Sequence, residues 1–214
     1  MLQRKTFSNR EEWLAGRPAS IGASEAAAII GISPFSSAHD LWERKTGNAP
    51  EKNLEGNPVI EYGNRLEPAM RVMFQAEHPE LKLEYYQFDM LYQGSRPWMT
   101  ATLDGELTDE RGRKGVLEIK TASVGKKSQW EKWHDAIPLY YRAQICHQLL
   151  VTGWDFAVLY AKLVKLNGDS ELRTYWFERE EMKEELDWLL EQETDFWNKF
   201  VLTRTAPPAT LPAL

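Results

Sequence analysis

The sequence predicts a mixed α/β (α+β) fold in which a central mixed β-sheet is flanked by helices. A series of segments rich in aromatic and β-branched residues indicates the strands. One segment with helical periodicity interrupts that series, and other helical segments precede and follow it. We find no internal repeat and no dividing linker in the sequence, so residues 1–214 are expected to form a single domain.

Three short helices are expected near the N-terminus, in 6–17, 20–32 and 36–47. A Ser or Asn that can cap a helix stands near the start of the first, and Gly47 closes the third. Ser24 opens the second of these helices, with an acidic residue in its first turn. The polar stretch 48–58 is expected to be a loop.

The segment 59–78 has the periodicity of an amphipathic helix and places Glu67 on its apolar side. Pro68 is expected either to kink this helix or to start a new one, because proline cannot donate a backbone hydrogen bond. The strand candidates follow at 81–92, 98–107, 115–122, 156–164 and 172–179. Two further helices are expected, at 138–153 and 180–203, and the proline-rich end, 205–214, is expected to be a flexible tail.

The composition excludes several kinds of protein. Cys146 is the only cysteine, which excludes an internal disulfide, a cysteine zinc site and a cysteine-ligated iron–sulfur cluster. No apolar run approaches the roughly 18 residues of a membrane span, and a signal peptide is not evident, so a cytosolic protein is expected. The net charge of −6 argues against indiscriminate nucleic-acid binding. The basic residues of 112–115, 125–127 and Arg142 either line one local channel or are ordinary surface charge.

Asp104, Glu118 and Lys120 stand out because apolar residues lead into each. Glu118 and Lys120 are two residues apart, so they share one face of a strand while Leu117 and Ile119 share the other. Asp104 ends the preceding strand, and the chain can return antiparallel beside it. Two buried carboxylates are costly unless a cation shares them, and Mg²⁺ or Mn²⁺ suits oxygen ligands. The alternative is a surface ion pair worth about 0–1 kcal/mol.

These residues resemble the PD-(D/E)xK nuclease superfamily, although Leu103 stands where the motif has proline. A narrower resemblance runs from about Arg17 to about Tyr160. Within it, "RPASIGASEAAAIIG", "YGNRLEPA" and "AQICHQLLVTG" are similar in order and kind to segments of phage lambda exonuclease and the YqaJ-type viral recombinase nucleases. The resemblance implies a restriction-endonuclease-like core.

The resemblance also implies the roles of the site residues. Asp104, Glu118 and the backbone carbonyl of Ile119 would hold Mg²⁺, and Lys120 would position a water or help to deprotonate it. Glu67 is similar to an additional acidic ligand of the family; its alternative role is an ion pair with Arg71, four residues later.

A glutamine and an end-binding pocket complete the implied site. Gln144 would hydrogen-bond the water or the scissile phosphate, and Gln148 lies one turn on, on the same helix face. If Ser24 caps a helix, the free amides of the next turn form an anion site, to which Arg17 adds a bidentate contact. In the resembled family such a pocket holds a 5′ phosphate. The alternative is that Ser24 is only a cap.

The implied function is an Mg²⁺-dependent 5′–3′ exonuclease that degrades one strand of linear double-stranded DNA for phage-type recombination by single-strand annealing. The implied partners are DNA ends, a single-strand annealing protein and two further copies of the chain in a homotrimeric ring, in the cytoplasm of a bacterial host cell. Two alternatives stay open: a PD-(D/E)xK endonuclease of other specificity, and a catalytically inactive DNA-binding module.

Overall fold

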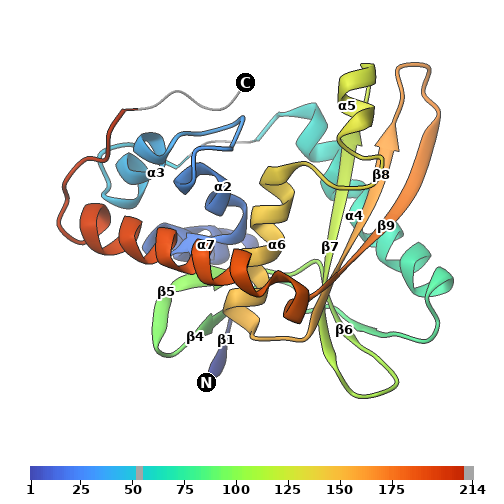
Figure 1. Ribbon diagram of the computed structural model, residues 1–214, viewed down its shortest axis with the longest axis horizontal. Helices are drawn as coiled ribbons and strands as arrows, with labels where there is room; N and C mark the ends of the chain where they lie inside the picture. The colour runs from blue at the N-terminus through green and yellow to red at the C-terminus, as the bar shows by residue number, and fades with distance from the viewer. Residues whose placement is uncertain (52–54, 210–214) are drawn as a thin grey trace.

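The computed structural model describes residues 1–51 and 55–209, which form two β-sheets with helices around them (Figure 1). One sheet has the strand order β1-β4-β5-β2 and the other has the order β3-β6-β7-β8-β9. The strands of the first are β1 (Leu2–Thr6), β4 (Asp89–Gln93), β5 (Arg96–Ala101) and β2 (Ile21–Gly22). Those of the second are β3 (Lys82–Glu84), β6 (Gly105–Thr108), β7 (Lys114–Ser123), β8 (Phe156–Val164) and β9 (Ser170–Glu178).

The five-stranded sheet is mixed, as predicted, because one of its connections is a helical crossover. β7 and β8 are parallel and are joined through α5 (Lys127–Glu131) and α6 (Leu139–Thr152), whereas the neighbouring pairs β6/β7 and β8/β9 are antiparallel. A parallel pair requires such a crossover. The segment α5 was not predicted from the sequence.

The central mixed sheet is accompanied by a second, four-stranded sheet that was not predicted. Two of the expected strands, 81–92 and 98–107, each break in the middle, and their halves belong to different sheets. In the first break Phe88 has a positive φ of 60°. In the second, residues 102–104 carry the chain from β5 to β6, so Asp104 lies between two strands rather than at the end of one. Strand propensity does not register such a break because it reads only local composition.

Helices cover both faces of the five-stranded sheet. α6 packs on one face, where Val116 and Leu159 belong to the larger buried cluster. α4 (Pro58–Glu77) packs on the other, where its Met70 and Phe74 contact the cluster that contains Leu117. A single helix runs through Pro68, which excludes the predicted alternative of a new helix there.

The N-terminal helices follow the sequence prediction in part. α1 (Arg10–Gly16) is capped by Asn9, one of the residue types predicted for that position, and α3 (Ala38–Lys45) is capped by Ser37. The second expected helix, 20–32, is replaced by the short strand β2, the 3₁₀ turn η2 (Ala23–Glu25) and the four-residue α2 (Ala26–Ile29), and a further 3₁₀ turn, η1 (Arg17–Ala19), precedes it. In the loop expected at 48–58, residues 52–54 lie outside the described residues.

The C-terminal helix begins and ends close to the predicted bounds. It consists of η3 (Arg179–Met182), α7 (Lys183–Phe196) and the π-helical turn η4 (Trp197–Val201). Of the predicted tail, 205–209 have no helix or strand and Pro207 is buried, whereas 210–214 lie outside the described residues. No helix in the described part of the chain has the length and apolar character needed to cross a membrane.

Candidate active site

The Asp104 carboxylate lies against β7 because β6 stops pairing just before it. The last β6/β7 pair is Gly105 with Leu117, so the amide of Ile119 has no strand partner on that edge. Asp104 Oδ2 accepts the Ile119 N–H at 2.7 Å. Burial, together with the charges of Glu118 and Glu67, raises the pKa of Asp104 well above its ordinary value, despite the opposing effect of Lys120 and the Ile119 amide. The site therefore holds more negative charge than its own cations neutralise.

Glu118 and Lys120 form a nearly buried ion pair on the α6 side of β7. The Glu118 residue is 2% exposed, and Lys120 Nζ lies 2.5 Å from its Oε1. Burial alone would lower the pKa of Lys120, but the charges of Glu118 and Asp104 outweigh it and raise that pKa. Lys120 is therefore an ammonium ion at neutral pH, able to donate hydrogen bonds and unable to accept a proton.

Two glutamines of α6 bind the same carboxylate, one at each oxygen. Gln144 Nε2 donates to Glu118 Oε1, and Gln148 Nε2 donates to Glu118 Oε2, each at 2.5 Å. The two glutamines are one helical turn apart, which places both on the face of α6 that meets β7. Sequence reasoning favoured Gln144 alone; the i, i+4 spacing of the pair was the signal for the second.

Glu67 approaches Asp104 from α4. Its side chain is 27% exposed and pairs with Arg71, which also donates to the Asp104 backbone carbonyl at 3.3 Å and stacks on Tyr85. The charge of Glu67 contributes to the raised pKa of Asp104, so the two carboxylates are close. Glu67 therefore lies near Asp104, and it also forms the ion pair with Arg71 that was its alternative role. Glu61, another acidic residue of α4, is exposed and accepts a hydrogen bond from the Gly56 amide.

The donor atoms of this site suit a hard cation. Asp104, Glu118 and Glu67 supply carboxylate oxygens, and the carbonyl of Ile119 leaves β7 on the same edge as its N–H, toward Asp104. Among residues 1–51 and 55–209, no group of three or more His, Cys, Asp or Glu side chains is gathered closely enough to enclose a metal ion. Mg²⁺ does not require such a cage, because it keeps several waters and binds through one or two carboxylates.

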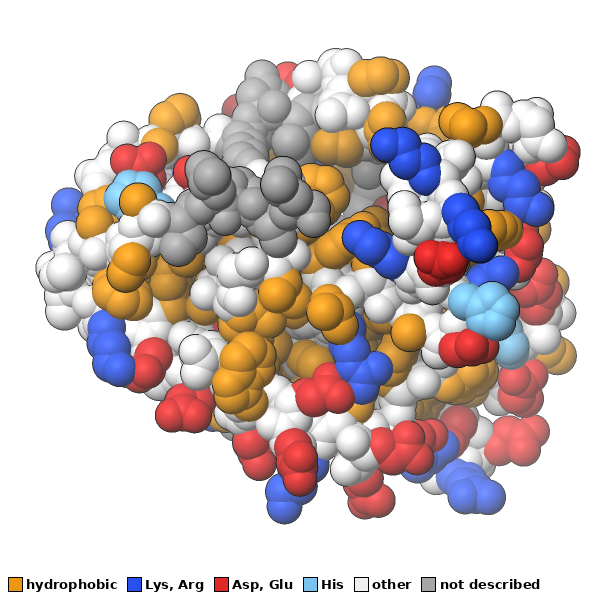
Figure 2. Space-filling view, turned by 45° about the horizontal axis from the view of Figure 1, so that its top comes forward, with side chains coloured by type: hydrophobic (Ala, Val, Ile, Leu, Met, Phe, Trp, Pro, Cys, Tyr) orange, Lys and Arg blue, Asp and Glu red, His pale blue; other side chains and the backbone are white. Residues whose placement is uncertain are grey.

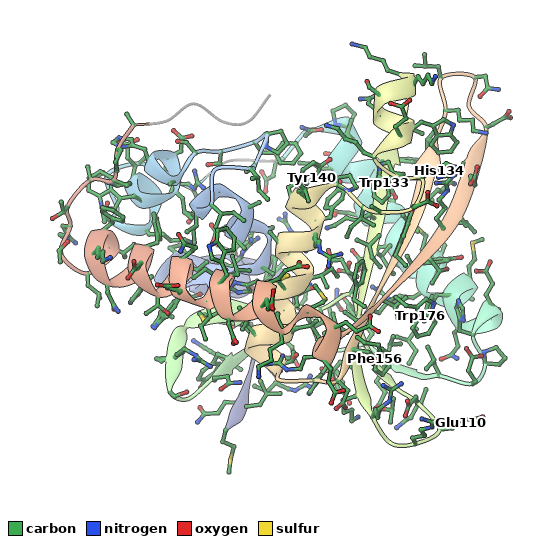
Figure 3. All side chains as sticks on the ribbon, viewed as in Figure 1. Glu110, Trp133, His134, Tyr140, Phe156 and Trp176 are labelled. Carbon is green, nitrogen blue, oxygen red and sulfur yellow. The ribbon has the colours of Figure 1, made fainter. Side chains whose placement is uncertain are left out.

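An aromatic wall at the start of α6 flanks the Lys120 ammonium, which lies 5.2 Å from the centre of the Tyr141 ring. Tyr141 packs in turn on Tyr140 and Trp133, with ring centroids 4.4 Å and 5.5 Å apart. Figure 3 shows Tyr140 on the first turn of α6 and Trp133 in the segment that leads into it. These contacts restrict the position of the ammonium, and they were not predicted from the sequence.

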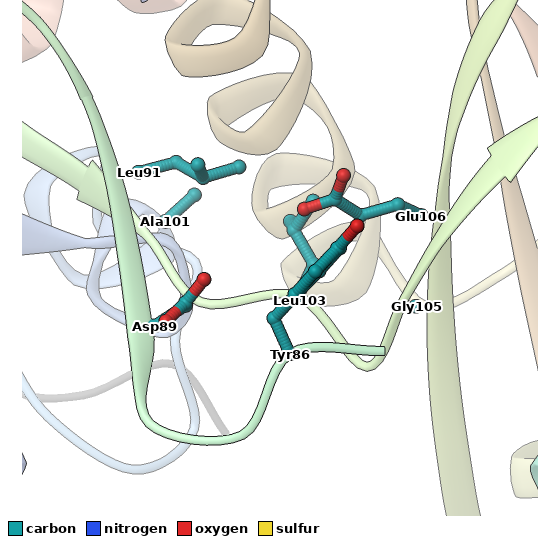
Figure 4. A pocket seen from close by; sticks show the side chains of 7 residues that line it. All are labelled: Tyr86, Asp89, Leu91, Ala101, Leu103, Gly105 and Glu106. Carbon is teal, nitrogen blue, oxygen red and sulfur yellow. The ribbon is translucent and has the colours of Figure 1, made fainter. Parts of the chain in front are cut away.

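Two cavities adjoin the strands that carry the site. The smaller, about 10 Å³, lies where β4, β5 and β6 meet, next to Leu103 and Gly105, and has room for one water (Figure 4). Arg4 ties this junction together by pairing with Asp89 and Glu106. The larger cavity, about 230 Å³, starts one residue beyond Lys120. It is lined by Thr121, Ser123 and Val164 of the sheet and by Pro58, Val59 and Tyr62 of α4.

The predicted cap at Ser24 is wrong. Gly22 is the N-cap of η2, and Glu25 closes this turn by accepting the Gly22 N–H at 2.9 Å, whereas Ser24 lies inside the turn with its side chain exposed. The buried Lys45 holds Glu25 in place at 2.9 Å. The two-residue sequence Ser-Glu had suggested a cap at Ser24, but the reach of the Glu25 side chain places the N-cap two residues earlier, at Gly22.

Arg17 lies on the same side of the molecule as Asp104, linked to it by a short chain of contacts. Its guanidinium sits over the ring of Trp13 at 5.0 Å. The Trp13 indole donates at 3.1 Å to Thr102 Oγ1, two residues before Asp104. Within the described part of the chain, no carboxylate pairs with the Arg17 guanidinium, so it is available to an anion.

The basic residues of 112–115 and 125–127 and Arg142 do not line one channel, which leaves the alternative of ordinary surface charge. Residues 112–115 precede and begin β7, and 125–127 follow its end, so a ten-residue strand separates them. Arg113 pairs with Asp109 and Glu178, and Arg142 is held in a bidentate pair by Glu185. In Figure 2 acidic side chains crowd the lower edge of the molecule, and hydrophobic side chains occupy much of its middle.

The fold around this site is that of known nucleases. An alkaline exonuclease (LHK-Exo) from Laribacter hongkongensis has a TM-score of 0.57 and 18% identity to this chain, covering 92% of it and 100% of the exonuclease chain. A phage related exonuclease from Haemophilus somnus 129PT has a TM-score of 0.53 and 15% identity, with coverages of 86% and 96%. The chain therefore has the predicted PD-(D/E)xK restriction-endonuclease-like fold.

Sequence similarity identifies the family of this chain. The profile of the YqaJ-like viral recombinase domain matches residues 12–155, and the chain belongs to this family. The Uncharacterized protein YqaJ of Bacillus subtilis (strain 168) is 28% identical over 207 residues. That match covers 97% of this chain and 61% of the relative, so the chain spans about three fifths of the relative's length.

Proposed function

We propose that this protein is an Mg²⁺-dependent deoxyribonuclease that degrades one strand of linear double-stranded DNA from its 5′ end. The observation that carries the proposal is the convergence of Asp104, Glu118, Lys120 and Gln144 on one cation-poor site in a chain of this family. Mn²⁺ is expected to substitute for Mg²⁺, because both accept oxygen ligands in octahedral geometry.

Each residue has a distinct task in hydrolysis. Asp104 and Glu118 would hold the cation, with the carbonyl of Ile119 and, at a second position, Glu67. A bound divalent cation makes water more acidic and neutralises charge on the phosphate. The Lys120 ammonium and the Gln144 amide donate hydrogen bonds, so they orient the attacking water and the phosphate oxygens. The raised pKa of Lys120 favours this donor role over the role of proton acceptor.

The 5′–3′ direction rests on Arg17. Its guanidinium lacks a described carboxylate partner and is linked through Trp13 and Thr102 to the strand break that carries Asp104. A 5′ phosphate bound there would set the distance from the strand end to the cation. Ser24 lies seven residues further on in the same short-turn region; its exposed hydroxyl remains available to such a phosphate, although it does not cap a helix.

The biological setting follows from the family. A nuclease of a viral recombinase family would expose a 3′ strand for a single-strand annealing protein, in the cytoplasm of a bacterial host cell. A homotrimeric ring around the duplex would reconcile an acidic chain with a DNA substrate, because basic groups could face inward while acidic groups face solvent.

The test is digestion of linear and circular duplexes, labelled at either end and carrying a 5′ phosphate or a 5′ hydroxyl, with Mg²⁺ or with EDTA. We expect a 5′ label to be released at once as a mononucleotide and a 3′-labelled strand to shorten progressively, on linear DNA alone, and only with the cation. Cutting of circular DNA would instead identify an endonuclease. Binding without cutting would identify an inactive DNA-binding module.

A further inference from the structure

Gln148 is the most completely buried polar side chain next to the catalytic strand, and one of its atoms is unsatisfied. The residue is 0% exposed. Its Nε2 donates to Glu118 Oε2, and its Oε1 has no hydrogen-bond partner among the described residues. Reversing the amide would place two acceptor atoms against each other, so the Glu118 carboxylate fixes the orientation of this amide.

An unsatisfied buried carbonyl destabilises the fold, because it loses its hydrogen bonds to water and gains none. An apolar side chain of similar volume would remove that penalty. A glutamine at this position is therefore a poor choice for stability alone. The hydrogen bond from Gln148 Nε2 to Glu118 is the only compensating contact that the described residues provide. The reason for a glutamine at this position therefore lies in the effect of that hydrogen bond on Glu118.

The donors Gln144, Gln148 and Lys120 are distributed unequally over the two oxygens of the Glu118 carboxylate. Oε2 faces the fully buried Gln148, whereas Oε1 faces Gln144 and Lys120, whose side chain is 21% exposed. Oε1 is therefore the oxygen on the accessible side. Hydrogen bonds from outer groups orient the carboxylates and imidazoles that bind metals, and losing such a group typically weakens metal binding or activity about 10- to 100-fold.

We propose that Gln148 is a positioning residue of the reaction: it fixes Oε2 of Glu118 so that Oε1 is presented to the cation and to the hydrogen-bond donors of Gln144 and Lys120. Gln148 does not touch the substrate. It acts through Glu118, and its unsatisfied Oε1 is the stability cost of that placement. The inference rests on the proposed function of the same site.

The decisive variant is Gln148→Met, which keeps the side-chain volume and removes both the hydrogen bond to Glu118 and the unsatisfied Oε1. Hydrolysis by this variant is expected to fall about 10- to 100-fold in kcat. The half-saturating Mg²⁺ concentration is expected to rise, while KM for DNA ends stays within about two-fold of wild type. In EDTA its melting temperature should be equal to or above that of the wild type. A residue with only a structural role would show the opposite combination: a lower melting temperature and an unchanged Mg²⁺ requirement.

Thr152→Val is the matched control. Thr152 is one turn further along α6 and donates its hydroxyl to the Gln148 backbone carbonyl at 2.8 Å. This isosteric change removes a buried hydrogen bond without touching Glu118, so it should lower the melting temperature and leave the Mg²⁺ requirement unchanged. If Gln148→Met behaves like Thr152→Val, the proposal is overturned.

Calorimetric titration with Mg²⁺ alone separates this inference from the proposed function. If the wild type binds Mg²⁺ but digests no DNA, the proposed function fails, and weaker Mg²⁺ binding by Gln148→Met still supports the positioning role. If the wild type digests DNA and the variant matches it in kcat and Mg²⁺ affinity, only the positioning role fails. A wild type that binds no Mg²⁺ overturns both.

Discussion

Replacing Arg17 with alanine is expected to slow the digestion of 5′-phosphorylated ends strongly and the digestion of 5′-hydroxyl ends little. The guanidinium is half-buried over Trp13 and has no carboxylate partner among the described residues. A charge-assisted hydrogen bond to a phosphate is worth about 1.5–3 kcal/mol, which corresponds to about a 10- to 150-fold change in rate or affinity. A 5′-hydroxyl end offers no terminal dianion, so the wild type should already be slow there.

The structural cost of the same substitution is small enough to be separated from this effect. Loss of the cation–π contact with Trp13 costs about 0.5–1 kcal/mol, or about 1–4 °C in melting temperature for a chain of this size. The folded population at 25 °C therefore stays close to complete, and a rate loss reports on binding. Arg17→Lys should be intermediate, because it keeps the charge but loses the bidentate geometry.

The assay compares initial rates on two duplexes that differ only in the 5′ group, for wild type, Arg17→Ala and Arg142→Ala. Arg142 is the control because Glu185 already holds it in a bidentate pair. Its loss should change the rates on both duplexes by the same factor. Equal losses on the two duplexes for Arg17→Ala would show that Arg17 is a general backbone contact or a structural residue, and would remove it from end recognition.

Three further outcomes are expected. Lys120→Ala should lower kcat at least about 100-fold and leave DNA binding largely intact, since Lys120 acts on the water and phosphate; activity within a few-fold of wild type would exclude it from the mechanism. Asp104→Asn or Glu118→Gln should weaken Mg²⁺ binding in calorimetry, and unchanged affinity in both would contradict the cation site. Burial alone would lower the pKa of His147, but the charge and hydrogen bond of Glu193 outweigh burial and raise that pKa above its usual 6.5. The pair therefore stabilises the fold below pH 6.5, and this contribution is lost as the pH rises through the raised pKa. His147→Gln should therefore cost about 3 kcal/mol at pH 6 and less at pH 9, and a melting-temperature difference that does not change with pH would refute this assignment.

Local signals in the sequence were sufficient for most helices and for the catalytic strand. Asn9 and Ser37 cap their helices because capping depends on a side chain and the amides two or three residues away. Glu118 and Lys120 share a face of β7 because alternation is a property of any strand. The same local reasoning failed at Ser24, where the longer side chain of Glu25 reaches back to Gly22 and moves the cap.

The sequence by itself determined the residue types of the site, the strand that carries two of them, and the fold class. Only the tertiary structure decided how they meet. Asp104 reaches Ile119 because the chain changes sheets at 102–104, and Gln148 reaches Glu118 because the crossover sets α6 against β7. These are contacts between segments separated by 15 and 30 residues, and their free energy depends on burial and on the combined charge of the whole cluster. Local propensity carries no information on either quantity, so the contact of Gln148 with Glu118, the aromatic wall and the division into two sheets emerged only from the packed chain.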